Sequence, residues 1–327
     1  MMRLSRYALG AAIAVVVLAA GPAARAAEPD KLLPANAEFV LTLNVKQIID
    51  SDIIKQYALE QLKQALQGAD AQKMLTQLGL DPLKDVSKVV IGGSGTDQSD
   101  MKMLMIIHGK FDPDKLFKAA EAMTKKKADN FTMLKDGKDT LFKFQPDTGN
   151  PVYATVKDEQ TILAGTDRKL VTAALASDGK KAPVGKELGS LIAKMDEKSS
   201  LWIVAVVKDK LANLKGGGKR GPIPAELKET LEKMDSMTLV VRITKDVVFD
   251  VALGMKDANS AEELGKMIDE QLTQLRGIVP FLTASKPELK GIADAAKSIK
   301  SAVKDKAVTI TGKLPGAAIG QALGKSD

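Results

Sequence analysis

The sequence predicts an α+β protein made of two related units of antiparallel sheet, with helices packed on one face of the sheet. Two observations lead to this class. Segments that alternate in hydropathy and are rich in β-branched residues recur along the chain and are followed by helical segments, as in layered α+β folds. The order of these segments in the first half also returns in the second half. The sequence leaves open whether the two units share one continuous sheet.

The internal repeat is weak but regular. Leu83 and Leu231 begin matching stretches, so the offset between the units is about 148 residues. Each stretch predicts two strands joined as a hairpin and then a helix. The expected ranges are Ser87–Ile91, Met101–His108 and Asp112–Met123 in the first unit, and Thr238–Ile243, Val247–Leu253 and Ser260–Leu275 in the second.

The beginnings of the two units match as well. Glu38–Val45 and Ser200–Val207 alternate as strands do, and each leads directly into a helix. We expect the first of these helices over Lys46–Ala65. In the second unit we expect its counterpart in two pieces, Lys208–Leu214 and Ala225–Met234.

Each unit is expected to end with a strand and a helix, preceded by an insertion that differs between the units. The insertion of the first unit has Gly and Asp turn signals between short strands, whereas that of the second has helical spacing. The final pairs are Thr161–Gly165 with Lys169–Ala176, and Val308–Gly312 with Pro315–Leu323; the insertions are the strands Phe131–Leu134, Thr140–Phe144 and Val152–Val156, and the helix Ala284–Lys304.

The first 26 residues predict a cleavable signal peptide. Arg3 and Arg6 precede an uncharged apolar run that is too short to cross a bilayer comfortably, and Ala24-Arg25-Ala26 fits the small-x-small cleavage rule. We therefore expect export, cleavage between Ala26 and Ala27, and a periplasmic or secreted protein. An uncleaved anchor is the alternative. The units then occupy residues 27–180 and 181–327, with Lys180–Gly189 as the boundary between them.

Composition narrows the classes of partner. Loss of Arg3, Arg6 and Arg25 with the leader lowers the formal net charge from +7 to +4, and aromatic residues make up only 4% of the chain. This composition lacks the basic and aromatic pattern that stacks on bases, so we expect no nucleic acid partner. We expect an unknown protein or small-molecule ligand, and no stable membrane insertion after cleavage. The chain has no cysteine, which excludes disulfides and thiolate chemistry.

No residue is assigned a catalytic, cofactor-binding or metal-binding role from the sequence, and no cofactor is expected. His108 is the single histidine, too few for a zinc site without cysteines. Gly92-Gly-Ser-Gly95 lacks the phosphate-loop spacing and is interpreted as a hairpin loop. Met101, Met103 and Met105 alternate on one strand, which we interpret as a face that points into the core.

The segment Leu33-Pro34-Ala35-Asn36-Ala37, which leads into the first strand, resembles the start of a broad set of uncharacterised secreted bacterial proteins. The proteins of that set have a domain of unknown function, and in them a signal peptide precedes a duplicated α+β unit. The resemblance implies this fold but no activity.

Three functions stay open from the sequence. The first is a non-enzymatic binding or scaffolding protein of the cell envelope or the extracellular space. The second is a hydrolase that uses carboxylates or a Ser–Lys pair. The third is a carrier that holds an apolar ligand between its helix layer and its sheet. Whether the protein is an enzyme is uncertain, and the absence of a catalytic constellation favours a non-enzyme.

Overall fold

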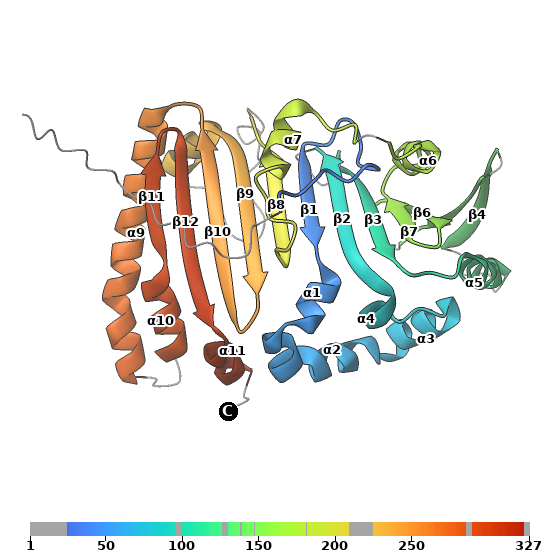
Figure 1. The fold of residues 1–327 in the computed structure, drawn as a ribbon, viewed down its shortest axis with the longest axis horizontal. Coiled ribbons are helices and arrows are strands. Elements are labelled where there is room, and N and C mark those ends of the chain that lie inside the picture. Colours follow the sequence, from blue (N-terminus) through green and yellow to red (C-terminus); the bar gives the residue numbers. More distant parts are fainter. Residues whose placement is uncertain are drawn as a thin grey trace, which may run out of the picture.

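The computed structural model describes residues 25–95, 100–125, 130–137, 139–146, 148–180, 182–208, 225–285 and 290–323. Its strands form a single sheet of 12 strands in the order β11-β12-β10-β9-β8-β1-β2-β3-β7-β6-β5-β4, and every neighbouring pair is antiparallel. Figure 1 shows the strands side by side, with helices at both ends and along one edge. The α+β class is confirmed, and the sheet is continuous.

All strand bounds except those of β11 follow the predicted segments closely. In the first half they are β1 Phe39–Leu43, β2 Val86–Ser94, β3 Lys102–Gly109, β4 Phe131–Asp136, β5 Asp139–Phe144, β6 Val152–Asp158 and β7 Thr161–Gly165. In the second half they are β8 Leu201–Val206, β9 Met234–Ile243, β10 Asp246–Met255, β11 Lys300–Lys304 and β12 Ala307–Pro315.

The strand order is the same in both directions from the centre of the sheet. From the central β1–β8 pair, the first half runs β1-β2-β3-β7-β6 and the second half runs β8-β9-β10-β12-β11. Each series begins with a single strand and continues with a hairpin. A second hairpin then adds two strands in the reverse of their order along the chain. This order is what a repeated unit would give; the duplication itself stays a prediction.

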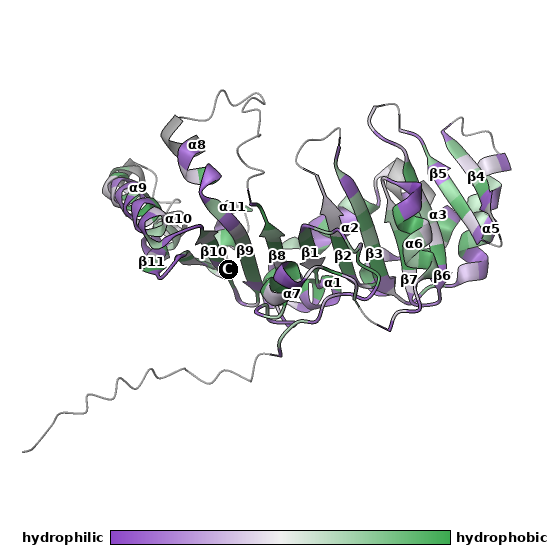
Figure 2. Ribbon diagram, turned by 90° about the horizontal axis from the view of Figure 1, so that it is seen from above, coloured by the Kyte–Doolittle hydropathy of each residue, from purple (hydrophilic) through white to green (hydrophobic). Residues whose placement is uncertain are grey.

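The helices lie on both sides of the sheet rather than on one. They are α1 Val45–Asp50, α2 Leu59–Leu66, α3 Ala69–Leu78, α4 Pro82–Asp85, α5 Pro113–Lys125, α6 Arg168–Ala176, α7 Lys186–Ile192, α8 Ala225–Glu232, α9 Ala258–Ser285, α10 Lys290–Ser298 and α11 Gly316–Ala322, with a π-helical turn at Ile54–Ala58. In Figure 2, α7 lies on one side of the sheet and α8 and α9 lie on the other. No helix in the described ranges is long and apolar enough to cross a membrane.

The main core lies between the first half of the sheet and the side that carries α6, α7 and residues 27–37. We call this side of the sheet the core face. Its strand side chains are almost completely buried, and Leu33 of the N-terminal segment and Ile192 of α7 pack against them. The core-face side chains are Val40 0%, Val90 1%, Leu104 0%, Ile106 0%, Leu163 0%, Trp202 3% and Val204 0% exposed.

Some sequence expectations were wrong. The expected helix over Ala284–Lys304 ends at Ser298, because Lys300–Lys304 form strand β11 by pairing with β12. The domain boundary at Lys180–Gly189 stays a prediction, but this segment contains the start of α7, whose Leu188 and Ile192 reach the core. Helix α3 was not predicted.

Two further expectations concern loops. Gly92, Gly93 and Ser94 belong to β2 and not to a hairpin loop. Glycine is required there because a Cβ on Gly92 would lie 2.4 Å from Leu33 Cδ2, and one on Gly93 would lie 2.5 Å from the Lys102 carbonyl oxygen. Residues 1–24 of the expected leader, all but Lys208 of the expected helix Lys208–Leu214, and the Gly-rich loop at 215–224 lie outside the described residues.

Candidate functional site: the open side of the sheet and two pockets

The central strands carry apolar side chains on both sides. Successive residues of a strand point to opposite sides of the sheet, so Leu104 on the core face is followed by Met105 on the other. Strands that are apolar on both sides are typical of sheets that are covered on both sides. Here the described residues bury the side chains on only one side of these strands.

We call the second side the open face and define it by two cross-strand rows. The register of the strands places these residues opposite one another without interruption over seven neighbouring strands. One row is Met105, Ile91, Leu41, Ile203, Leu239 and Val251, and the other is Ile162, Ile107, Val89, Leu43, Leu201, Val241 and Phe249.

Every side chain of these two rows is only half-buried. Within the described residues, none of them belongs to the three buried clusters or packs against one. Towards β10 and β12 the same side of the sheet is covered, because Met237 and Leu253 pack with Leu264 of α9 and Leu231 of α8. At the other end, Phe117 of α5 lies 5.7 Å from Phe142 of β5, between ring centroids. The open face therefore lies between two covered ends.

The open face offers apolar contact and little else. Its side chains are aliphatic, thioether or aromatic, and the backbone groups beneath them are engaged in the strand ladders. A ligand with many buried polar groups would find no partners there and would lose the energy of its hydrogen bonds to water. Seven strands at a spacing of about 4.8 Å make the face roughly 29 Å wide. It suits long, apolar ligands.

Met105 belongs to the open face and Met103 lies on the same side of β3, so the expectation that these two side chains point into the core was wrong. Met103 and Met105 are half-buried, whereas Leu104 and Ile106, which alternate with them, are 0% exposed. Methionine is flexible and polarisable and adapts to ligands of different shape.

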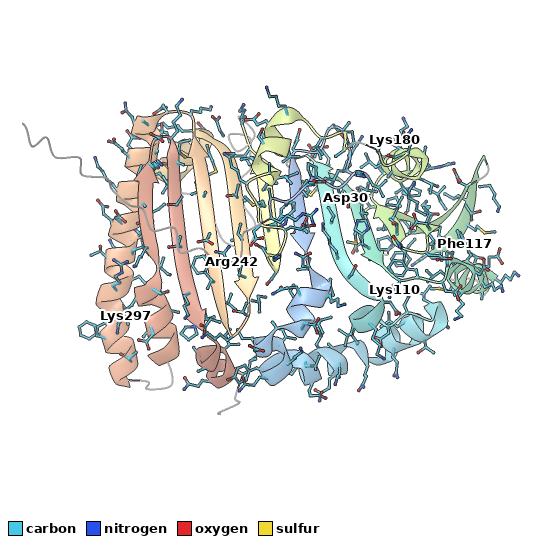
Figure 3. The ribbon with its side chains drawn as sticks, in the orientation of Figure 1. Asp30, Lys110, Phe117, Lys180, Arg242 and Lys297 are labelled. Carbon is cyan, nitrogen blue, oxygen red and sulfur yellow. The ribbon has the colours of Figure 1, made fainter. Side chains whose placement is uncertain are left out.

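A first pocket, of about 570 Å³, surrounds the single histidine. His108 Nε2 lies 2.6 Å from Asp30 Oδ2, and Asp30 Oδ1 accepts a hydrogen bond of 3.0 Å from the Leu32 N–H. Nothing in the sequence linked these groups, since they are 78 residues apart. Asp30 lies at the start of the N-terminal segment (Figure 3), so the pair fastens this segment to β3.

The electrostatics of this pocket favour a structural role. Burial by itself raises the pKa of the Asp30 carboxyl, but the hydrogen bonds from His108 and Leu32 and the charges of His108 and Lys88 lower it below 3.8 overall. Asp30 is therefore a carboxylate at neutral pH and not a proton donor. Lys157 Nζ donates to the carbonyl oxygens of Ala174, Leu175 and Ser177, at the end of α6.

Nucleophilic catalysis by a serine or threonine needs the hydroxyl to be hydrogen-bonded to a general base. The described residues of this pocket do not have that arrangement. Among the described residues, no serine or threonine hydroxyl bonds to the His108 ring. The same part of the chain holds no group of three His, Cys, Asp or Glu side chains that could bind a metal ion. The geometry around His108 supports attachment of the segment and gives no support to a hydrolase.

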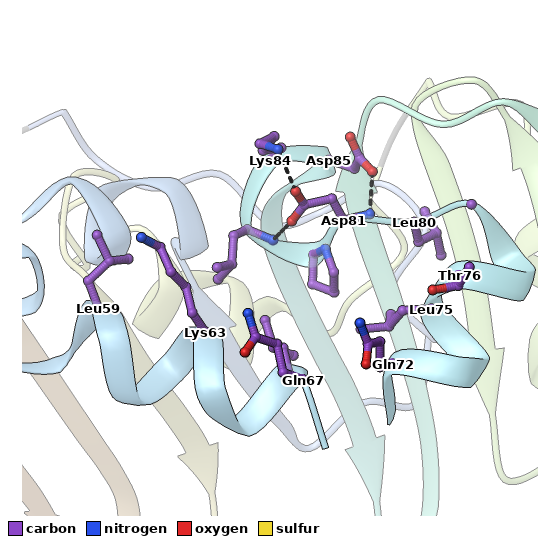
Figure 4. Close-up of a pocket in the computed structure, with 14 residues that line it drawn as sticks. Leu59, Lys63, Gln67, Gln72, Leu75, Thr76, Leu80, Asp81, Lys84 and Asp85 are labelled. Atoms are coloured by element: carbon purple, nitrogen blue, oxygen red, sulfur yellow. Dashed lines mark hydrogen bonds and ion pairs between the residues drawn. The ribbon is translucent and has the colours of Figure 1, made fainter. Parts of the chain in front are cut away.

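A second pocket, of about 740 Å³, lies between α2, α3 and α4 at the end of the strands. Figure 4 shows leucine side chains along its wall and the acids Asp81 and Asp85 at α4. Asp81 is the N-cap of α4, with its carboxylate accepting from the Leu83 N–H and pairing with Lys84 at 2.8 Å. The lining leucines are Leu59, Leu66, Leu75, Leu80 and Leu83. These acids are engaged in capping the helix.

Comparisons with protein-family models, with curated proteins and with solved structures gave no match. The resemblance to secreted proteins of unknown function stays a prediction. A proposal for this chain has to come from the geometry of the open face and of the two pockets.

Proposed function

We propose that this protein is an exported, non-enzymatic binding protein that holds a long-chain acyl amphiphile against the open face of its sheet. The observation that carries the proposal is the pair of apolar rows, one across six strands and one across seven, whose side chains are only half-buried while the opposite side chains of β7, β3, β2, β1 and β8 are buried. An apolar surface of this kind usually marks a binding site.

The chemistry of the face favours an acyl chain over a polar ligand. A chain that spans one leaflet is about 15 Å long, half the thickness of the hydrocarbon layer. The width of about 29 Å between the covered ends accommodates such a chain across the strands, or more than one. Aliphatic and methionine side chains contact it without demanding a fixed shape.

The expected affinity is micromolar. Removing roughly 500 Å² of combined ligand and protein apolar surface from water contributes about 12 kcal/mol. Lost translational and rotational freedom offsets about 4 kcal/mol or more of this. About 8 kcal/mol is left, which corresponds to a Kd near 1 µM.

The sequence suggested an apolar ligand between the helix layer and the sheet, whereas the proposed ligand lies on the other side of the sheet. The space between the helices α6 and α7 and the sheet is filled by side chains of the main core, such as Leu163, Val171 and Ile192. The open face lies on the opposite side of the same strands. Export is part of the proposal. Cleavage after Ala26 would remove the Ala26–Asp196 bridge and the Arg25–Glu197 ion pair and would leave Ala27, which is buried beside Met195, as the first residue.

Two measurements test the proposal. Protein purified from the exported fraction of a bacterial host is examined by native mass spectrometry, and its organic extract is analysed for lipids. We expect an extra mass that is lost on denaturation and an acyl lipid in the extract. The stripped protein is then titrated with a fluorescent long-chain fatty acid, and binding in the micromolar range is expected.

A matched pair of variants locates the ligand. Ile203→Gln lies in the middle of the open face, whereas Val248→Gln lies on the other side of β10, beside the Arg242–Asp250 ion pair. Ile203→Gln is expected to weaken fatty acid binding about tenfold, and Val248→Gln to leave it unchanged. Equal affinities for both variants, or no binding by the wild type, would reject the open face as the binding site.

A further inference from the structure

The C-terminal half of α9 carries an exposed apolar ridge. Leu275 is 39% exposed, Ile278 is 53% exposed and Phe281 is 76% exposed. Residues three apart lie along one row of a helix surface, so these side chains form a continuous line about 9 Å long. Figure 1 shows α9 as the outermost element beside β11, which places the ridge at the end of the molecule.

The opposite side of the same helix is firmly packed. Leu272 is 9% exposed, and Val279 is 4% exposed and forms a separate cluster with Ala293 and Ala296 of α10. The Arg276 guanidinium donates to the Ile299 carbonyl oxygen at 2.6 Å. These contacts fix the rotation of α9, so the ridge faces outward because of the fold.

The charge of α9 changes along its length. Its first half contains Glu262, Glu263, Lys266, Asp269 and Glu270, whereas the stretch 271–285 contains a single charge, the cation of Arg276. A ridge that is free of acids does not repel an anionic surface.

The exposed charges of the adjacent elements are mainly basic. Lys297 of α10 and Lys300 at the start of β11 are exposed, and the neighbouring acid is Asp294, whose carboxylate lies 3.8 Å from Lys297. Basic groups beside an apolar ridge favour contact with anionic lipid.

The small size of the ridge favours a bilayer over a second protein as its partner. A stable protein interface buries roughly 800 Å² on each partner, far more than three side chains on a line of about 9 Å supply. A second copy of the chain is therefore a poor occupant. A bilayer requires no matching shape, since each apolar side chain that enters the interfacial region contributes on its own.

We propose that the C-terminal half of α9 is a membrane-contact surface, with Phe281 and Ile278 entering the headgroup boundary of an anionic bilayer and Lys297 and Lys300 of the adjacent elements near it. The contact is peripheral and reversible. It goes beyond the proposed function and does not depend on it. If both hold, the ridge brings the open face to the lipid from which an acyl ligand is taken or to which it is delivered.

Flotation with vesicles tests this proposal. Wild-type protein is mixed with vesicles of phosphatidylglycerol and phosphatidylethanolamine, and separately with phosphatidylcholine vesicles. We expect it to float with the anionic vesicles, and to do so less at high salt, because screening weakens the attraction of Lys297 and Lys300. The double variant I278S/F281S is expected to lose about tenfold or more of this partitioning.

Phe144→Ser is the matched control, because Phe144 is 46% exposed and lies on β5, at the opposite half of the sheet. It is expected to float as the wild type does. Urea unfolding of I278S/F281S checks that the fold is intact, since both side chains are exposed. Fatty acid binding in solution by I278S/F281S should be unchanged, which separates failure of this proposal from failure of the binding proposal.

Three outcomes would overturn the membrane contact. The first is wild-type protein that floats with neither vesicle. The second is equal loss of flotation in Phe144→Ser and in I278S/F281S. The third is a dimer of the wild type that I278S/F281S abolishes, which would assign the ridge to self-association.

Discussion

Leu104 and Met105 are neighbours on β3, both apolar, and they face opposite sides of one sheet. Leu104 is 0% exposed under α6 and the N-terminal segment, whereas Met105 is half-buried on the open face. The same contrast holds for Trp202 and Ile203 on β8. Burial of one side is completed within the described chain and that of the other is not. The sheet therefore gains more of its stability on the core face, and the open face is the surface to which we propose that the ligand binds.

In the second half of the sheet, the core-face side is more polar and partly exposed to solvent. On β9 and β10 this side carries Arg242, which is labelled in Figure 3, and Asp250, and the two form an ion pair whose side chains are 41% and 37% exposed. The other side carries Val241 and Val251 of the open face. This clean alternation is typical of an antiparallel sheet with one wet side. The apolar side is therefore continuous through both halves, while the covering changes from one side of the sheet to the other.

The largest expected effect is on stability. Leu104→Ala is expected to lower the free energy of unfolding by about 2–5 kcal/mol, because it leaves a cavity in a packed core. Met105→Ala should cost less than about 1.5 kcal/mol, since solvent already reaches that site. Urea denaturation of both variants measures the difference. Equal losses would mean that the open face is covered as completely as the core face.

Thiol reactivity gives a more direct comparison of the two sides. The chain contains no cysteine, so a single introduced thiol reports on its own position. Met105→Cys should react with a maleimide about 100-fold faster than Leu104→Cys, which requires opening of the core. A saturating fatty acid should protect Met105→Cys. An unreactive Met105→Cys in stripped protein would contradict the exposure of this face.

The packing of the N-terminal segment on the core face is expected to depend on the Asp30–His108 pair. Asp30→Asn should lower the free energy of unfolding by about 1–2 kcal/mol at pH 7, because it removes a charge-assisted hydrogen bond. The folded-state pKa of Asp30 lies below its unfolded value of 3.8, so its contribution is present above that value and is lost as the pH falls through the folded pKa.

The variant should therefore lack this acid-dependent part of the stability. Denaturation of wild type and Asp30→Asn at pH 7 and near pH 3 measures it. A stability difference between the two proteins that is constant over this range would refute the role of the carboxylate. Glu28→Gln is a suitable control, because Glu28 lines the same pocket and is exposed.

The smallest expected effect is on the solvated side of the second half. Arg242→Ala removes the ion pair with Asp250, whose partners are 41% and 37% exposed. Exposed ion pairs contribute about 0–1 kcal/mol and are screened by salt. We expect a loss below about 1 kcal/mol that shrinks at high salt. A loss as large as that of Leu104→Ala would mean that this side is covered in the folded protein.

Local patterns in the sequence determined most of the elements. Side chains alternate in a strand and repeat every 3.6 residues in a helix, so β1, β8 and α5 were visible without tertiary information. The strand β11, Lys300–Lys304, was not, because its Lys, Ser and Ala residues have weak strand propensity and the pairing with β12 imposes the conformation. Helix α7 was missed for a similar reason, since burial of Leu188 and Ile192 stabilises a short segment.

The candidate site depended on tertiary structure almost entirely. Strands such as β8 are apolar on both sides, so their composition could not show which side the helices cover. The pairing of His108 with Asp30 joins residues that no local pattern connects. By itself the sequence determined the α+β class, the order of most elements and the lack of thiol chemistry, because these follow from local periodicity and composition. Only the tertiary structure decided that the sheet is continuous and that the described residues leave one of its apolar sides half-buried, because covering a surface depends on contacts between distant segments.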